Sequence, residues 1–197
     1  ETRVLYGQDY FYERLLGMEF KITPFSFFQP NSRAAEVLYS TVRDYLGDMK
    51  GKTLYDLFSG TGTIGQILSP VAEQVIGVEI VEDAIKDAKR NAEINGITNA
   101  EFIVGASEDV ITNMAKEGIK ADVIVVDPPR KGCDEALLNT IIAMKPKKVV
   151  YVSCNPGTLA RDLRILEAGG FQTKEVQPVD MFPQTTHVES VAKLVLK

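Results

Sequence analysis

Asp56-Leu57-Phe58-Ser59-Gly60-Thr61-Gly62-Thr63-Ile64-Gly65 is the stretch that decides the fold of this chain. It follows an apolar segment, so the pattern predicts a strand near 53–58, a glycine-rich turn and a helix near 63–68. Because glycine has no Cβ, Gly60 and Gly62 permit a tight turn and a close backbone approach by a ligand. Gly65 permits close packing of the helix against the sheet.

An acidic residue, Glu79, ends the next expected strand about 20 residues further on, where a carboxylate can bind ribose hydroxyls. Alone, this pattern leaves three interpretations open. The turn binds a dinucleotide, it binds S-adenosylmethionine (SAM), or it is a tight turn without a ligand.

Strands and helices alternate outward from this stretch, which predicts an α/β fold. We expect strands near 53–58, 74–79, 101–104, 122–127 and 148–153, and helices near 63–68, 82–95, 108–116, 134–143 and 157–167. Two last strands, near 171–178 and 188–196, have no helix between them and are expected to pair antiparallel at the sheet edge. The pattern predicts a doubly wound, mostly parallel sheet of seven strands with a terminal antiparallel hairpin.

The first thirty residues differ from the rest. Residues 5–10 and 16–22 are interpreted as short strands around turns, and residues 1–30 as a remnant of a central β region. Asn31 or Ser32 is expected to cap a helix from about Arg33 to Leu46 that ends at Gly47. Residues 31–197 then form the main domain.

Asp127-Pro128-Pro129-Arg130 ends the fourth expected strand, next to the glycine loop if the sheet has the usual switch point. The two prolines fix φ and remove two N–H donors, so they can form a rigid rim for a planar base or a carboxylate. At a sheet edge this motif resembles that of SAM-dependent methyltransferases acting on nucleobases, and the resemblance favours SAM over a dinucleotide; a mere strand-ending turn is the alternative.

Ser153-Cys154-Asn155-Pro156 places a cysteine between the fifth expected strand and the start of a helix. Orphan N–H groups and the positive helix end favour a thiolate there, so Cys154 can act as a nucleophile. Packing as a small buried hydrophobe is an equal alternative.

Composition indicates a cytoplasmic globular protein. The 197 residues are 45% hydrophobic, and no apolar run reaches the ~20 residues of a membrane span. Cys133, Cys154 and the single histidine, His187, have no metal-ligand spacing, so reduced thiols and no metal are expected. The net charge of −5 argues mildly against a general nucleic-acid surface.

The combined motifs resemble those of the RNA uracil-5-methyltransferases. The resemblance is carried by residues 27–31 (Phe-Phe-Gln-Pro-Asn), 56–62, 127–132, 153–156 and 180–189 (Asp-Met-Phe-Pro-Gln-Thr-Thr-His-Val-Glu), in the order of the family and across nearly the whole chain. The last motif is closer to the branch that modifies 23S ribosomal RNA than to the transfer-RNA branch. Ser59, Ile64 and Cys133 depart from the usual family residues, which bears on fine specificity.

The resemblance implies the fold of class I SAM-dependent methyltransferases, SAM as the methyl donor and RNA as the substrate. It implies that SAM is contacted by Gln29, Phe58, Gly60, Thr63, Glu79 and Asp127. It also implies that Cys154 is the nucleophile and Glu189 the proton acceptor. Family members usually carry an amino-terminal RNA-binding domain, which we expect in a longer parent chain, and no membrane partner is implied.

The chemistry of uracil C5 requires both catalytic groups. Addition of a thiolate at C6 makes C5 nucleophilic, and a base must then remove the C5 proton. The target base must leave its stack to reach the site. Arg130 and Lys131 are either phosphate contacts or a solvated basic pair, and His187 either orients a neighbour or is merely exposed. Three alternatives remain: a methyltransferase for exocyclic amines, a nucleotide-binding dehydrogenase and a non-catalytic RNA-binding module.

Overall fold

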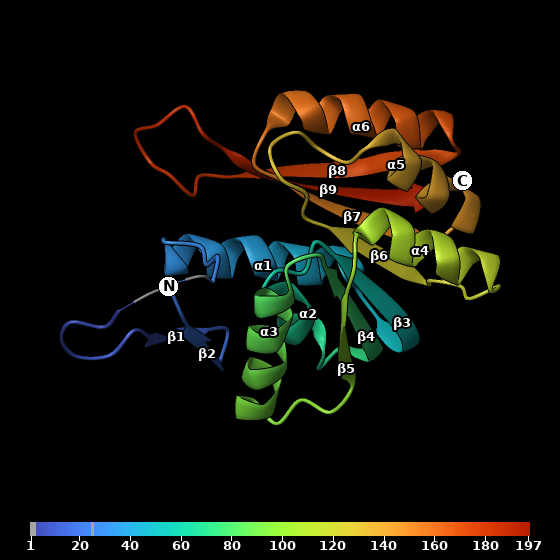
Figure 1. Ribbon diagram of the computed structural model, residues 1–197. Helices are drawn as coiled ribbons and strands as arrows, with labels where there is room; N and C mark the ends of the chain where they lie inside the picture. Colours follow the sequence, from blue (N-terminus) through green and yellow to red (C-terminus); the bar gives the residue numbers. More distant parts are fainter. Residues whose placement is uncertain (1–2, 25) are drawn as a thin grey trace.

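The structure is a computed structural model that describes residues 3–24 and 26–197 (Figure 1). Within these residues the elements are β1 (Phe11–Leu15), β2 (Met18–Ile22), α1 (Ser32–Leu46), β3 (Met49–Leu57), α2 (Thr63–Leu68), β4 (Ala72–Glu79), α3 (Glu82–Ile94), β5 (Ala100–Val104), α4 (Ser107–Lys116), β6 (Val123–Val126), α5 (Glu135–Met144), β7 (Lys148–Ser153), α6 (Pro156–Ala168), β8 (Phe171–Val179) and β9 (Glu189–Leu196). The predicted alternation of strands and helices is confirmed, mostly to within two residues at each boundary.

Seven strands form one sheet in the order β5-β4-β3-β6-β7-β9-β8, and β1 and β2 form a separate hairpin. The first five strands of that order are parallel, whereas β9 is antiparallel to both β7 and β8. The strand order reverses between β3 and β6, which are direct parallel neighbours. This is the expected switch point, and the terminal hairpin lies at the expected edge.

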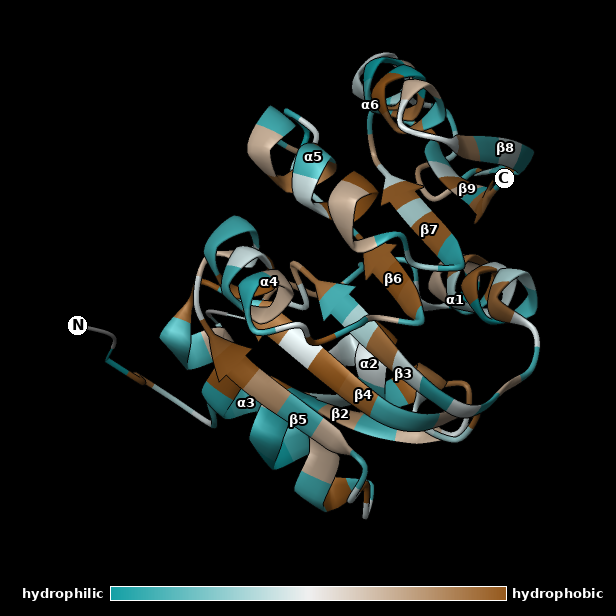
Figure 2. Cartoon of the chain, turned by 90° about the vertical axis from the view of Figure 1, so that its right-hand side faces the viewer, coloured by the Kyte–Doolittle hydropathy of each residue, from teal (hydrophilic) through white to brown (hydrophobic). Residues whose placement is uncertain are grey.

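Both faces of the central strands are buried. Successive apolar residues of such a strand point alternately into two cores, one on each face of the sheet. Val123 and Val125 of β6 belong to the core under α1 and α2, while Ile124 and Val126 belong to the core under α4, α5 and α6. Figure 2 shows β6 in the brown of hydrophobic residues along its length. The sheet therefore forms the middle of three layers.

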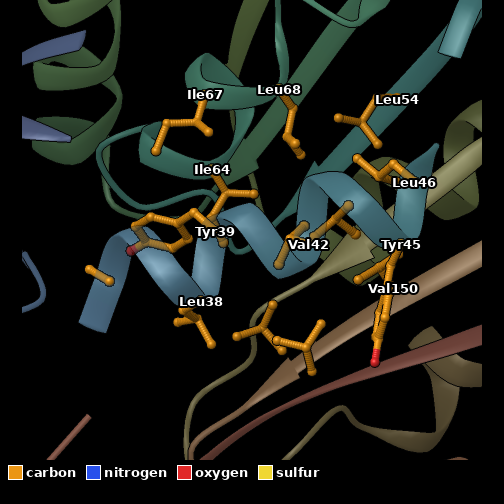
Figure 3. Close-up of a cluster of buried hydrophobic side chains, with 14 of the residues drawn as sticks. Leu38, Tyr39, Val42, Tyr45, Leu46, Leu54, Ile64, Ile67, Leu68 and Val150 are labelled. Carbon is orange, nitrogen blue, oxygen red and sulfur yellow. The ribbon is translucent and has the colours of Figure 1, made fainter. Parts of the chain in front are cut away.

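Helix α1 crosses the sheet on the side that also carries α2 and α3 (Figure 1). Its amino terminus is capped by Asn31, whose side chain accepts a hydrogen bond from Ala34 N at 3.1 Å. Leu38, Val42 and Leu46 are buried, and Figure 3 shows them with Tyr39 in one cluster with side chains of α2 and the sheet. The helix period thus matches a one-sided apolar stripe.

The interpretation of residues 5–10 as a strand is wrong. The first strand begins at Phe11, and in the preceding segment Leu5 and Tyr6 are 85% and 98% exposed. Leu16 and Gly17 adopt positive φ angles of 50° and 84° and form the turn, so the second strand begins at Met18 rather than at Leu16. A two-residue turn with both φ angles positive fixes the hairpin register around it.

The hairpin is attached to α3 by side-chain amides. Asn91 and Asn95 each exchange two hydrogen bonds with the backbone of β2, at Lys21 and Glu19 respectively, over 2.8–3.3 Å. In addition, Phe20 of β2 is buried in the core under α1. None of the helices in the described ranges is long and apolar enough to cross a membrane.

Candidate functional site

The motif residues converge at one edge of the sheet because of the strand directions. Parallel strands β3, β4, β6 and β7 all end at this edge, and antiparallel β9 begins there. Phe58, Asp127 and Cys154 follow β3, β6 and β7, while Glu79 ends β4 and Glu189 opens β9. Ligands of open α/β sheets bind outside this edge at the switch point.

The glycine loop after β3 has positive φ angles, and its backbone is open on one side at Gly60. Phe58 has a φ of 64°, which is unfavourable for a non-glycine residue, and Gly60 and Gly62 have φ angles of 53° and 74°. A Cβ on Gly60 would meet no atom within 4 Å, so the loop is open on that side. The carboxylate of Glu79 accepts hydrogen bonds from Gly60 N at 3.1 Å and Val81 N at 2.9 Å, which ties the loop to the end of β4.

Gly62 and Gly65 are required by packing. A Cβ on Gly62 would lie 2.6 Å from the Phe102 ring, and one on Gly65 would lie 3.0 Å from Asp56 Oδ2. The N–H of Gly65 donates to that same oxygen at 2.8 Å. The predicted close approach of helix α2 to the sheet is therefore present in the structure.

A hollow next to the glycine loop collects the residues expected to contact SAM. Its lining includes Gln29, Phe58, Gly60, Thr63 and Asp127, together with Phe27, Phe28, Tyr39, Ser59, Thr61 and Ile64. Glu79 is not part of the lining but is hydrogen-bonded to the loop that is. Cys154 and Glu189 do not line the hollow either, but they lie at the same edge of the sheet.

One residue of the lining has a buried polar atom without a partner. Ser59 Oγ has no hydrogen-bond partner among the described residues. Buried polar groups are normally paired. A polar ligand in this hollow could supply a partner for Ser59 Oγ.

A larger hollow, of about 430 Å³, lies at the opposite edge around the amino ends of β3 and β4. It is lined by Gly47, Asp48, Met49, Lys50, Pro70, Val71, Ala72 and Glu73. No carboxyl end of a parallel strand and no cysteine lies in this lining. Chemistry therefore favours the smaller hollow at the switch point.

The register of β7 and β9 brings the two expected catalytic residues together. Ser153 pairs with Ser190 as the last partners of the antiparallel ladder, so Cys154 and Glu189 are the next residues on each strand. Glu189 raises the pKa of the Cys154 thiol, and the guanidinium of Arg130 lowers the pKa of both groups. A candidate nucleophile and a candidate base thus lie next to each other at the sheet edge.

The two cysteines differ in access. Cys154 is half-buried, whereas Cys133 is 3% exposed and lies in the core under α5 and α6. Burial raises the pKa of Cys133 to about 12, so its thiolate is disfavoured. Of the two free thiols, Cys154 is the one suited to nucleophilic attack.

The electrostatics of Cys154 differ from the sequence-based expectation. Burial raises the pKa of its thiol above that of a free cysteine, and the nearby carboxylates of Glu189 and Asp127 raise it further. The guanidinium of Arg130 acts in the opposite direction. The helix start was expected to favour the thiolate, but desolvation and two acidic neighbours outweigh it because one dipole end is a fractional charge.

Glu189 has a related environment. It is 5% exposed, and burial raises the pKa of its carboxyl, while Arg130 lowers it. Arg130 itself is exposed, and its guanidinium lies 3.5 Å from His187 Nδ1. Lys131 and His187 are also exposed. Arg130 is therefore the cation that acts on both catalytic candidates.

Tyr39 and Asp56 were not assigned roles from the sequence. Burial, then Glu189 and Asp56, raise the pKa of Asp127 to about 8, and burial raises that of Asp56 to about 7. Burial and the carboxylates of Asp127, Asp56 and Glu189 also raise the pKa of Tyr39. These four groups come from α1, β3, β6 and β9, so only the fold brings them together. The sequence signal was a tyrosine on the buried stripe of α1, which an ordinary core residue also gives.

The first and last motifs are joined by one contact. Asn31 Nδ2 donates to the carbonyl oxygen of Met181 at 3.2 Å, linking the start of α1 to the loop between β8 and β9. Among residues 3–24 and 26–197, no group of three or more histidine, cysteine or acidic side chains is arranged to hold a metal ion.

The sequence of this chain is similar to those of known RNA methyltransferases. The family profile described as tRNA (Uracil-5-)-methyltransferase matches residues 1–197. An uncharacterized RNA methyltransferase of Halalkalibacterium halodurans is 55% identical over 197 residues, covering 100% of this chain and 43% of its own. One of Bacillus cereus is 58% identical over 191 residues, covering 97% and 42%.

Among solved structures, the tRNA (uracil-54, C5)-methyltransferase of Pyrococcus abyssi in complex with S-adenosyl-L-homocysteine matches with a TM-score of 0.84. It is 40% identical, and the match covers 96% of this chain and 45% of that one. The chain has the fold of class I SAM-dependent methyltransferases. It spans less than half of the length of the relatives that it matches.

Proposed function

The chain belongs to the tRNA (uracil-5-)-methyltransferase family, and on that premise we propose that it transfers a methyl group from SAM to C5 of a uridine in RNA. The observation that carries the proposal is the β7–β9 register, which puts Cys154 beside Glu189 at the switch-point edge. Uracil C5 methylation requires such a pair, a nucleophile for C6 and a base for the C5 proton.

The hollow at the glycine loop is the proposed SAM site. Gln29, Phe58, Gly60 and Thr63 line it, and Asp127 closes it from the end of β6. Glu79 lies at the end of β4, where its carboxylate can accept hydrogen bonds from ribose hydroxyls. SAM supplies an electrophilic methyl group on a sulfonium. The partnerless Ser59 Oγ and the open face of Gly60 are the features that fit such a ligand.

Cys154 performs the first step. Its thiolate adds to C6 of the uracil ring, forming a C–S bond and moving an electron pair onto C5 and the O4 enolate. C5 thereby becomes able to attack the methyl group of SAM, whose bond to the sulfonium would break so that S-adenosylhomocysteine would leave. Arg130 stabilises the thiolate form of Cys154, since it is the positive charge that lowers the pKa of that thiol.

Glu189 performs the last step. After methylation C5 carries both a methyl group and a hydrogen, and the carboxylate of Glu189 accepts that hydrogen as a proton. The electron pair re-forms the C5–C6 double bond and expels the Cys154 thiolate. The raised pKa of Glu189 makes it a stronger base than an exposed glutamate.

The proposed substrate is a uridine of 23S ribosomal RNA, extruded from its stack to meet the site. This choice rests on the motif at residues 180–189, which resembles that of the ribosomal branch. The Pyrococcus abyssi structure is that of a tRNA methyltransferase, so tRNA is the competitor that a test must include. Arg130 and Lys131 are exposed at the edge and can contact phosphates of the bound RNA.

The deciding experiment is the transfer of labelled methyl from SAM by the full-length protein to unmodified 23S rRNA and tRNA, with nucleoside analysis of the product. We expect 5-methyluridine in 23S rRNA. Label in tRNA alone overturns the ribosomal assignment. Label on an exocyclic amine, retained in Cys154→Ala, overturns the C5 chemistry.

A further inference from the structure

The loop that carries Arg130 is fastened to helix α6 through its backbone. The carbonyl oxygen of Arg130 accepts hydrogen bonds from Asn155 Nδ2 and Thr158 Oγ1, both at 3.2 Å. Asn155 is also the N-cap of α6, where its side chain accepts from Gly157 N at 3.0 Å. The start of α6 therefore fixes the backbone position of Arg130. The N-cap of this helix, Asn155, directly follows Cys154 in the chain.

Arg161 fastens the next part of the same loop. Its guanidinium donates to the carbonyl oxygens of Lys131 and Cys133, at 2.9 and 3.1 Å. The same side chain donates through Nε to Asp162 Oδ1 at 2.7 Å. A planar guanidinium can serve two carbonyls and a carboxylate in this way because its donors form a rigid fork.

Asp162 is the buried centre of the arrangement. Its side chain is fully buried, and Oδ2 accepts from Cys133 N at 2.8 Å and from Tyr151 Oη at 2.6 Å. With Arg161 on Oδ1, the carboxylate has partners on both oxygens. A buried charge with this many donors is rigidly placed.

Gly132 allows the loop to approach this closely. It has a φ of 78°, and a Cβ there would lie 2.6 Å from Arg161 Nη2 and 2.6 Å from Asp162 Oδ2. In contrast, the guanidinium of Arg130 is exposed, and within the described ranges its hydrogen-bond contact is His187 at 3.5 Å. The direction of Arg130 is thus set mainly by its own backbone.

We propose that Arg161 and Asp162 are positioning residues that clamp residues 130–133 onto α6, with Thr158, and so keep the guanidinium of Arg130 beside Cys154 and Glu189. Their catalytic importance rests on the proposed function; their effect on the thiol does not. Cys154 faces Glu189 from β9, Asp127 from the end of β6 and Arg130 from the loop. Only Arg130 lowers its pKa among these side chains.

The test titrates the Cys154 thiol in the full-length protein by the pH dependence of its alkylation with iodoacetamide, followed by mass spectrometry of the Cys154 peptide. Arg130→Gln gives the effect of losing the guanidinium. Arg161→Lys and Thr158→Val both preserve net charge but remove hydrogen bonds to the loop. Arg164→Lys, an exposed residue of α6 with no hydrogen-bond or ion-pair partner among the described side chains, is the matched control.

We expect Arg161→Lys and Thr158→Val to move the alkylation midpoint to higher pH, as Arg130→Gln does, by about half a pH unit. In the Arg130→Gln background neither should cause a further shift, since both act through Arg130. The control should leave the midpoint unchanged. A shift of half a unit lowers the thiolate fraction about threefold, so kcat for methylation near neutral pH should fall by about that factor.

The proposal is overturned if Arg130→Gln shifts the midpoint while Arg161→Lys and Thr158→Val do not, or if their shifts persist without Arg130. No shift in Arg130→Gln also overturns it. If Arg161→Lys does not fold, as thermal unfolding would show, Thr158→Val decides alone. A wild-type protein that methylates no RNA disproves the proposed function but leaves the thiol titration valid.

Discussion

Arg130 acts on both Cys154 and Glu189, which the proposed reaction uses at different times. In that reaction the thiol is ionised before the methyl transfer, and the carboxylate accepts a proton after it. Arg130 lowers the pKa of both groups, while burial raises both. Removing the Cys154 thiol and removing the Glu189 carboxylate should therefore block the proposed reaction at different steps.

Cys154→Ala should abolish methyl transfer and any covalent complex with RNA, because C5 never becomes nucleophilic. Glu189→Gln should allow addition and methylation but stall elimination, so an enzyme–RNA adduct should accumulate. The measurement is a denaturing gel of full-length protein with substrate RNA and SAM, with 5-fluorouridine RNA and wild type as the positive control. Turnover by wild type without any adduct in either trapping condition would show that catalysis is not covalent.

The methylation rate should rise with pH through the alkaline range. In the proposed reaction the thiolate is the active form of Cys154, and burial and two carboxylates raise the pKa of this thiol above that of a free cysteine. A raised pKa moves the ascending limb of the rate profile to higher pH. Single-turnover rates measured from pH 6 to pH 10 test this, and a limb centred below the pKa of an ordinary thiol would contradict it.

Glu79→Ala should weaken SAM binding by about 1–3 kcal/mol, as expected when charged hydrogen bonds to a ligand are lost. Isothermal titration calorimetry with SAM measures the change, and Glu93→Ala, an exposed residue on α3, is the control. Wild-type protein that binds neither SAM nor its demethylated product would refute the cofactor site as a whole.

Asp127→Asn should stabilise the protein at high pH. The pKa of Asp127 is raised from 3.8 to about 8, so the folded state binds its proton more tightly than the unfolded state. The associated stability is present below the unfolded pKa and is lost as pH rises to about 8. Asparagine removes this loss, and we expect a gain of about 1–2 kcal/mol at pH 9 and little change at pH 4. Urea unfolding at both pH values checks it, and an equal effect at both would be inconsistent with a raised pKa.

The strands and helices were predictable because their signals are local and mutually consistent. Buried parallel strands such as β6 are unbroken apolar runs, and Asn31 and Gly47 mark the ends of α1. The strand predicted at residues 5–10 is absent because a short segment beside turn residues does not show whether a partner strand exists. Tyr39 could not be found because its neighbours come from other elements, and the pKa direction of Cys154 depended on burial that only the fold defines.

The packing of α2 against β4 and β5 gives a prediction at the same scale. Gly62→Ala should destabilise the protein by about 2–4 kcal/mol, since the φ of 74° is strained and the Cβ would meet Phe102 at 2.6 Å. Gly96→Ala is the control, with a φ of 64° and no atom within 4 Å, and should cost about 1 kcal/mol. Denaturant unfolding compares them, and equal losses would show that packing at Gly62 contributes nothing.

At the scale of the whole molecule, the net charge of −5 opposes binding to a polyanion. Relatives that match this chain are more than twice its length, and the resemblance implies an RNA-binding domain outside it. We expect this chain alone to bind RNA weakly at physiological salt and with a shallow salt dependence. Fluorescence anisotropy with substrate RNA tests this, and tight binding with a steep salt slope would place the main RNA surface on this domain.

The attachment of the hairpin to α3 has a consequence for sequence variation. Within β2, the side chains of Asn91 and Asn95 form hydrogen bonds with main-chain atoms only, at Lys21 and Glu19 respectively. A deep mutational scan should therefore find both asparagines intolerant and the two strand positions permissive. Each amide occupies an N–H and a C=O that would otherwise be open to another β-strand. Losing either should appear first as self-association of the protein, before any loss of the proposed methyl transfer.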